Sequence, residues 1–108
     1  MFRGTTPTNT FTSGIDLSEA AVVYLTYTQR GTVRIEKTKE DITFTSDQGD
    51  EHTPPSYTMT VVLTQEETLG LDETGVEIQV RARFADGTAV ASHVVKTTAE
   101  RILKDGEI

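Results

Sequence analysis

The groups best suited to bind an ion lie in one acidic stretch, Asp47-Gln48-Gly49-Asp50-Glu51-His52. Carboxylate oxygens on a flexible loop are ligands that Ca²⁺ accepts, so a metal site is one interpretation. The stretch lacks the alternating ligand spacing and the closing bidentate glutamate of an EF-hand loop, and a solvated loop explains it better. We predict no metal ion, while the order of residues 46–55 and their ability to bind an ion stay open.

Groups capable of catalysis follow no familiar arrangement. The two histidines, His52 and His93, lie on separate predicted elements, and a dyad or two-histidine metal site would need them to converge. No serine stands in a Gly-x-Ser-x-Gly context. Glu67 is better explained as the capping partner of Thr64 than as half of a carboxylate pair. The sequence therefore predicts no catalytic residue and no cofactor.

Composition narrows the class of protein further. A chain of 108 residues with 35% hydrophobic residues is the size of one domain. Its net charge of -7 disfavours nucleic acid as a partner, because the mean field repels phosphate. No apolar run approaches the roughly 20 residues that span a bilayer, and the first residues lack the apolar stretch of a signal peptide. Cysteine is absent, which excludes disulfides and thiolate-bound metals.

The strongest structural signal is the alternation of apolar and polar residues from Val76 to Phe84. A period of two over nine residues predicts a strand with one face in a core. Asp86-Gly87 follows and suits a tight turn, so residues 88–97 are expected to return antiparallel. Arg30-Gly31 predicts a second hairpin, in which Val33 and Ile35 face the core.

The whole pattern predicts an all-β fold, an immunoglobulin-like antiparallel β-sandwich of about seven strands. Capping pairs at Asp16 and Thr64 predict one or two single-turn helical crossovers. Inward side chains are expected to fill the sandwich and leave no cavity for chemistry. Residues 1–97 form the single domain, with 1–7 as an extended N-terminal arm and 98–108 as a polar C-terminal tail. The remaining predicted strands are residues 8–15, 21–29, 32–38, 42–45 and 57–63.

Two segments are candidate interaction surfaces. Arg81 and Arg83 share the polar face of the alternating strand, which is either a solvated face or a docking patch for an acidic neighbour. The N-terminal segment is either a disordered leader or an arm that adds to the sheet edge of another subunit. Its candidate contact residues are Arg3, Thr5, Thr6 and Pro7.

The opening residues 3–8, Arg-Gly-Thr-Thr-Pro-Thr, resemble the start of a family of small proteins encoded in prophages of Gram-positive gut bacteria. Residues 36–41, 63–69 and 78–83, with Asp86-Gly87 and Ala91-Ser92, are similar to that family in the same order. The loop from Asp47 to Pro55 is longer than the compact turn expected of the family. The fold resembles the immunoglobulin-like N-terminal domain of phage baseplate upper proteins, which is an analogy of fold only.

The resemblance implies a non-catalytic phage or prophage structural component, associated with a tail, baseplate or neck. Its expected partners are other particle proteins or copies of itself, with neither nucleic acid nor membrane. We expect it to be made in the bacterial cytoplasm without a signal peptide and assembled into a virion. The alternative is a stand-alone module that recognises a carbohydrate or a host surface protein through Tyr24 or Tyr27.

Overall fold

The strand β6 (Gly75–Arg83) confirms the strongest pattern in the sequence. In the computed structural model, which describes residues 1–108, its four apolar residues Val76, Ile78, Val80 and Ala82 are all buried. The residues between them are exposed or half-buried. Because successive side chains of a strand point to opposite faces, β6 presents one face to the core and the other to solvent.

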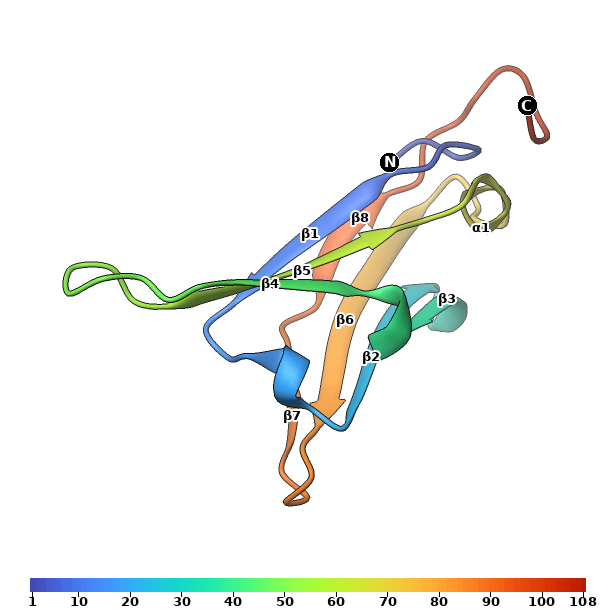
Figure 1. Ribbon diagram of the computed structural model, residues 1–108. Coiled ribbons are helices and arrows are strands. Elements are labelled where there is room, and N and C mark those ends of the chain that lie inside the picture. The colour runs from blue at the N-terminus through green and yellow to red at the C-terminus, as the bar shows by residue number, and fades with distance from the viewer.

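Eight strands form two antiparallel sheets (Figure 1). The smaller sheet has the order β1-β5-β4, and the larger has the order β3-β2-β6. Both β7 and β8 pair with the remaining edge of β6. The bounds of the other strands are β1 Thr8–Ser13, β2 Val22–Gln29, β3 Thr32–Thr38, β4 Thr43–Asp47, β5 Ser56–Val62, β7 Ala89–Ala91 and β8 Val95–Thr98.

The strand order is that of an immunoglobulin-like sandwich without its first strand. With the strands of that fold lettered A to G, β1, β5 and β4 occupy positions B, E and D, and β3, β2 and β6 occupy C′, C and F. Together β7 and β8 occupy position G. The predicted antiparallel β-sandwich is confirmed. Eight strands are present instead of about seven because pairing is interrupted between Ala91 and Val95.

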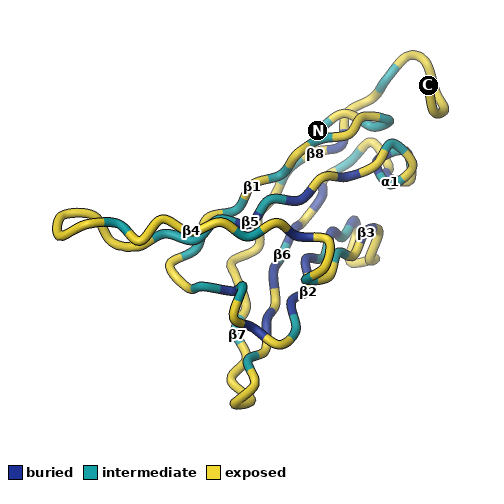
Figure 2. The backbone as a smooth tube through the Cα atoms, in the orientation of Figure 1, coloured by how far each residue is buried: buried dark blue, intermediate teal, exposed yellow.

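The core lies between the two sheets, where buried residues of β2 and β6 in the larger sheet face those of β5 in the smaller (Figure 2). Burying these side chains removes apolar surface from water, which is the main favourable contribution to folding. Only two buried residues are polar, Gln29 and Thr68. The buried apolar residues are Leu17, Ala20, Val23, Leu25, Tyr27, Ile35, Ile42, Met59, Val61, Leu63, Leu71, Val76, Ile78, Val80, Ala82 and Ala99.

One residue predicted to face the core does not. Ile35 is buried as expected, but Val33 is 54% exposed. The pairing of β2 with β3 shifts by one residue after Tyr27, so that Val33 lies opposite Thr28 on the outer face. A β-bulge of this kind reverses the facing of every residue beyond it. The prediction for Val33 is therefore wrong.

Both predicted hairpin turns are present. Arg30 and Gly31 both have positive φ, 51° and 78°, the combination that a two-residue type I′ turn requires. In the turn after β6, Gly87 has a φ of 91° and the Asp86 carboxylate accepts a hydrogen bond from the backbone N–H of Thr88. These short turns fix how β2 meets β3 and how β6 meets β7.

Helical structure is limited to short crossovers. The helix α1 (Gln65–Leu69) begins with the predicted capping box, in which the Thr64 hydroxyl accepts from the Glu67 N–H and the Glu67 carboxylate accepts from the Thr64 N–H. The 3-10 turn η1 (Leu17–Glu19) is capped by Asp16. A second 3-10 turn, η2 (Lys39–Asp41), was not predicted. No helix is both long enough and apolar enough to cross a membrane.

The hairpin formed by β4 and β5 projects beyond the two sheets (Figures 1 and 2). Its pairing continues outward to Asp47 and Ser56, and residues 48–55 close it. Every residue from 48 to 55 is exposed except the half-buried Gly49. The predicted loop is therefore the tip of a projecting hairpin, and β4 continues two residues further into it, through Ser46 and Asp47, than the sequence suggests.

Candidate interaction surface

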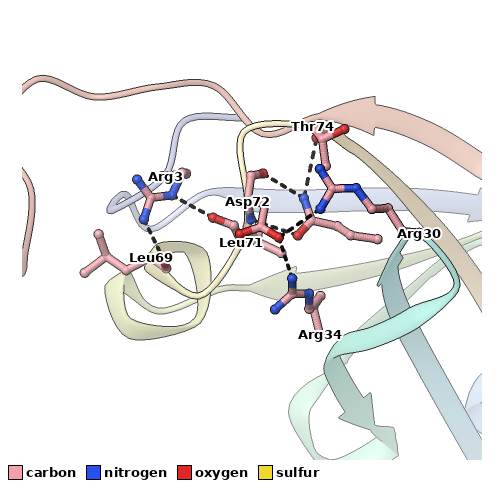
Figure 3. A network of polar contacts seen from close by, with 8 residues as sticks. Arg3, Arg30, Arg34, Leu69, Leu71, Asp72 and Thr74 are labelled. Carbon is pink, nitrogen blue, oxygen red and sulfur yellow. Dashed lines mark hydrogen bonds and ion pairs between the residues drawn. The ribbon is translucent and has the colours of Figure 1, made fainter.

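The N-terminal segment is attached to its own domain by Arg3 (Figure 3). Its guanidinium donates through Nε to the carbonyl of Leu71 at 2.7 Å and through Nη2 to the carbonyl of Leu69 at 2.9 Å. Those carbonyls belong to the end of α1 and the connection that follows, which ordinary backbone pairing leaves without partners. Arg3 is thus an intramolecular anchor, and its side chain is only 19% exposed.

Residues 1–7 are not the extended arm that the sequence predicts. Met1 to Arg3 run parallel to the chain beyond β8, with Phe2 bridged to Glu100, and the backbone turns at Gly4, whose φ is 68°. The Thr68 hydroxyl accepts from the Thr5 N–H at 3.1 Å and donates to the Thr5 carbonyl at 2.8 Å. These partners are distant in sequence, so pattern reading could not identify them.

The other N-terminal candidates have different surroundings. Thr5 and Thr6 are exposed, whereas Pro7 is half-buried and its carbonyl accepts from the backbone N–H of Leu63. The boundary placed at residue 97 also changes, because β8 continues to Thr98 and Ala99 is 1% exposed. The N-terminal segment and the start of the C-terminal tail therefore belong to the folded domain.

A buried glutamine supports the connection between α1 and β6. Gln29 Nε2 donates to the Asp72 carbonyl at 2.8 Å, and Gln29 Oε1 accepts from the Asp72 N–H at 2.9 Å. The Asp72 carboxylate, in turn, lies 2.6 Å from Arg34 and 3.3 Å from Arg30 (Figure 3). This network uses two arginines that would otherwise be free cations at the edge of the larger sheet.

A second ion pair joins the larger sheet to α1. Lys37 Nζ lies 2.7 Å from a Glu67 carboxylate oxygen, and the two side chains are 13% and 27% exposed. Burial by itself raises the pKa of Glu67, but the hydrogen bonds from Lys37 and from the Thr64 backbone outweigh it and hold that pKa below its ordinary value. Lys37 is accordingly a structural group.

Arg81 and Arg83 are placed differently from these paired cations. Both are exposed on the outer face of β6, and neither guanidinium makes a hydrogen bond or ion pair with the rest of the chain. Across the sheet, Arg81 faces Tyr24 of β2 and Arg83 faces Val22. Tyr24 is 44% exposed. Two unpaired cations thus stand beside an exposed aromatic ring.

Alanines complete this surface on its other side. Ala91 and Ala89 of β7 lie opposite Arg81 and Arg83, and a shallow hollow of about 200 Å³ lies beside the short side chain of Ala89. We call the surface of Val22, Tyr24, Arg81, Arg83 and Ala89 the arginine patch. The sequence identified its two arginines but not its neighbours, because those depend on how β6 pairs with β2.

An open groove separates the two sheets along one side, between β1 and the β7–β8 edge. Its volume is about 540 Å³. The expectation that inward side chains leave no cavity is therefore wrong on this side of the sandwich. The larger lining side chains include Phe11, Met59, Val90 and Val95, and no carboxylate lines it. In the lettered scheme it lies between strands B and G, where no strand A is present.

The two histidines occupy different parts of the fold. His52 lies at the tip of the β4–β5 hairpin, and His93 lies in the interruption between β7 and β8 beside the groove. No group of three or more His, Cys, Asp or Glu side chains is arranged to hold a metal ion. Tyr27, one of the two tyrosines considered for sugar binding, is fully buried and cannot present its ring to a ligand.

Burial also changes the chemistry of Tyr27. It raises the pKa of the phenol to about 12, although Asn9 donates a hydrogen bond to the phenol oxygen.

Comparison of the chain with models of protein families, with curated proteins and with solved structures finds no match.

Proposed function

We propose that this chain is a non-catalytic structural component of a phage or prophage particle, associated with a tail, baseplate or neck, that acts through protein–protein contacts. The observation that carries the contact part of the proposal is the open edge formed by β7 and β8. No strand pairs with its outer side, where the only contact is that of the Met1 amine with the Thr98 carbonyl at the end of β8, and the edge borders an apolar groove. The assignment to a phage particle rests on the sequence resemblance alone.

An open edge of this kind is suited to β-strand addition. Backbone N–H and C=O groups that lack partners can pair with an extended segment of another protein. Ser92 N–H donates to the Val80 carbonyl, so the N–H of Ala91, one residue earlier, points away from β6. Apolar side chains of an added strand would enter the groove. Affinity would thus come from the backbone and selectivity from the groove.

The proposal is tested with a matched pair of variants. Val95→Lys places a charge at the mouth of the groove, where Val95 is 46% exposed, and charged side chains on an edge oppose strand addition. Val33→Lys makes the same change at a 54% exposed position on the opposite edge of the sheet. We expect tagged Val95→Lys to be depleted at least about tenfold from purified particles, and Val33→Lys to be retained.

Mass spectrometry of particles purified after prophage induction supplies the measurement. Far-UV circular dichroism of both purified variants establishes that the sandwich is intact. Absence of the wild-type chain from the particles would overturn the assignment to a particle. Equal incorporation of the two variants would show that the β7–β8 edge is not the contact surface.

A further inference from the structure

We propose that the arginine patch binds the acidic tip of the β4–β5 hairpin of a second copy of this chain. The inference names a partner for the proposed interaction module, and it rests on that proposal only in treating the chain as a protein that acts through protein contacts. The arginine patch is a different surface from the groove beside β7 and β8. An experiment can therefore disprove self-association through the patch without disproving strand addition at the β7–β8 edge, and the reverse.

The first step is the isolation of the two arginines. Of the ten lysines and arginines, six bind a carboxylate or a backbone carbonyl within the chain. Arg81, Arg83, Lys96 and Arg101 do not. Only Arg81 and Arg83 lie two residues apart on one strand, which places both on the same face of the sheet. They place two unpaired positive charges on one face of a chain with a net charge of -7.

The second step is the chemistry that such a surface accepts. Guanidinium groups bind carboxylates through paired, charge-assisted hydrogen bonds. The hollow beside them is walled by Val22, Tyr24 and Ala89, so a short acidic side chain could enter while its chain atoms pack on apolar groups. Tyrosine and arginine are among the residue types most enriched at the energetic centres of protein interfaces. An acidic, protruding peptide segment is the best-matched occupant.

The third step is that the chain itself carries such a segment. The hairpin tip holds Asp47, Asp50 and Glu51 and no lysine or arginine. It projects away from the sheets, and all three carboxylate residues are exposed (Figures 1 and 2). The negative charge of the tip complements the positive charge of the arginine patch. We therefore take a second copy of the chain as the partner.

The tip is also held in shape before any contact forms. Asp47 accepts a hydrogen bond from the Gly49 N–H at 2.9 Å, and Asp50 accepts from the N–H groups of His52 and Thr53, both at 2.8 Å. An ordered segment loses less conformational entropy on binding than a flexible one. Each carboxylate uses only one oxygen in these bonds, which leaves the other for a guanidinium.

Each copy offers one hairpin and one arginine patch, so the contact joins two different surfaces. Reciprocal insertion of two hairpins closes a dimer, whereas head-to-tail repetition generates larger rings or open filaments. We expect wild-type protein at low ionic strength to form dimers or larger species. We expect about 0.5 M salt to dissociate them, because screening weakens exposed charge pairs.

Neutral substitutions separate the two halves of the contact. R81Q/R83Q removes the patch and keeps the hairpin, whereas D50N/E51Q does the reverse. Each variant alone is expected to be monomeric in sedimentation velocity and light scattering. An equimolar mixture retains one working patch and one working hairpin, and is expected to form a 1:1 dimer and nothing larger.

Two further variants control for charge and for the groove. K96Q/R101Q changes the net charge as R81Q/R83Q does, using cations outside the patch, and is expected to associate like wild type. Val95→Lys is also expected to self-associate normally, since it alters only the groove. A wild-type chain that stays monomeric at low salt, loss of association in K96Q/R101Q, or failure of the mixture to dimerise would each overturn the proposal.

Discussion

Replacing Gln29 by methionine tests whether one buried amide holds the connection between α1 and β6. Methionine has nearly the length of glutamine but no polar atoms at its end. The change removes the hydrogen bonds of 2.8 Å and 2.9 Å to the backbone of Asp72. Gln29 is only 2% exposed, so water cannot take the place of its amide without local opening.

The expected loss follows from the groups left behind. The partly buried N–H and C=O of Asp72 each lose their side-chain partner, and an unsatisfied polar group costs up to about 1–3 kcal/mol according to its burial. The thioether recovers about 1 kcal/mol through apolar burial. We expect Gln29→Met to lower the free energy of unfolding by about 2–3 kcal/mol. For a domain of this size, that lowers Tm by about 8–15 °C.

Urea unfolding followed by far-UV circular dichroism measures the loss, with the m-value reporting whether the transition stays two-state. Gln48→Met is the matched control, because Gln48 is exposed at the hairpin tip. It is expected to change stability by less than about 0.5 kcal/mol. If the free energy of unfolding of Gln29→Met is also within about 0.5 kcal/mol of the wild-type value, the role assigned to the amide network is refuted.

Three further substitutions probe the other buried or paired groups. Lys37→Met removes the partner of Glu67 and is expected to destabilise the fold by about 1–3 kcal/mol at neutral pH. Because the pKa of Glu67 is lowered in the fold, its contribution is present above its ordinary pKa and is lost as pH falls, so urea unfolding from pH 7 to pH 3 should show the two proteins converging. Tyr27 has a pKa raised from 10.0 to about 12, so the unfolded chain releases its proton first and stability should fall between about pH 10 and pH 12, by at most about 2–3 kcal/mol. Tyr27→Phe should remove that part of the pH dependence in the same unfolding experiment. Arg3→Met removes two hydrogen bonds to backbone carbonyls, and is expected to lower Tm without changing self-association in sedimentation velocity.

Local patterns predicted much of the sandwich because each depends on neighbours along the chain. The alternation in β6 settles which side chains are buried, and a two-residue turn at Arg30-Gly31 sets the pairing of the strands it joins. The capping box at Thr64 likewise involves residues three apart. These signals act over a few residues, so a single sequence contains all the information they need.

The missed features arise from contacts between distant segments. The bulge that exposes Val33 is a property of a strand pair, not of either strand alone. Arg3 resembled a free cation because its acceptors, the carbonyls of Leu69 and Leu71, carry no side-chain signature. Gln29 gave no signal either, since its partners are backbone groups of the connection after α1.

The arginine patch depends both on local sequence patterns and on a contact between distant strands. The alternation of β6 requires Arg81 to face outward, and the burial of Val23 and Leu25 requires Tyr24 to do the same. Their adjacency depends on the register between β2 and β6, which no short turn sets because these strands are far apart in sequence. A slip by two residues would keep every side chain on its present face and still separate Tyr24 from Arg81. The sequence therefore predicts that Tyr24 and Arg81 face outward. That they lie side by side on one surface is shown only by the structure.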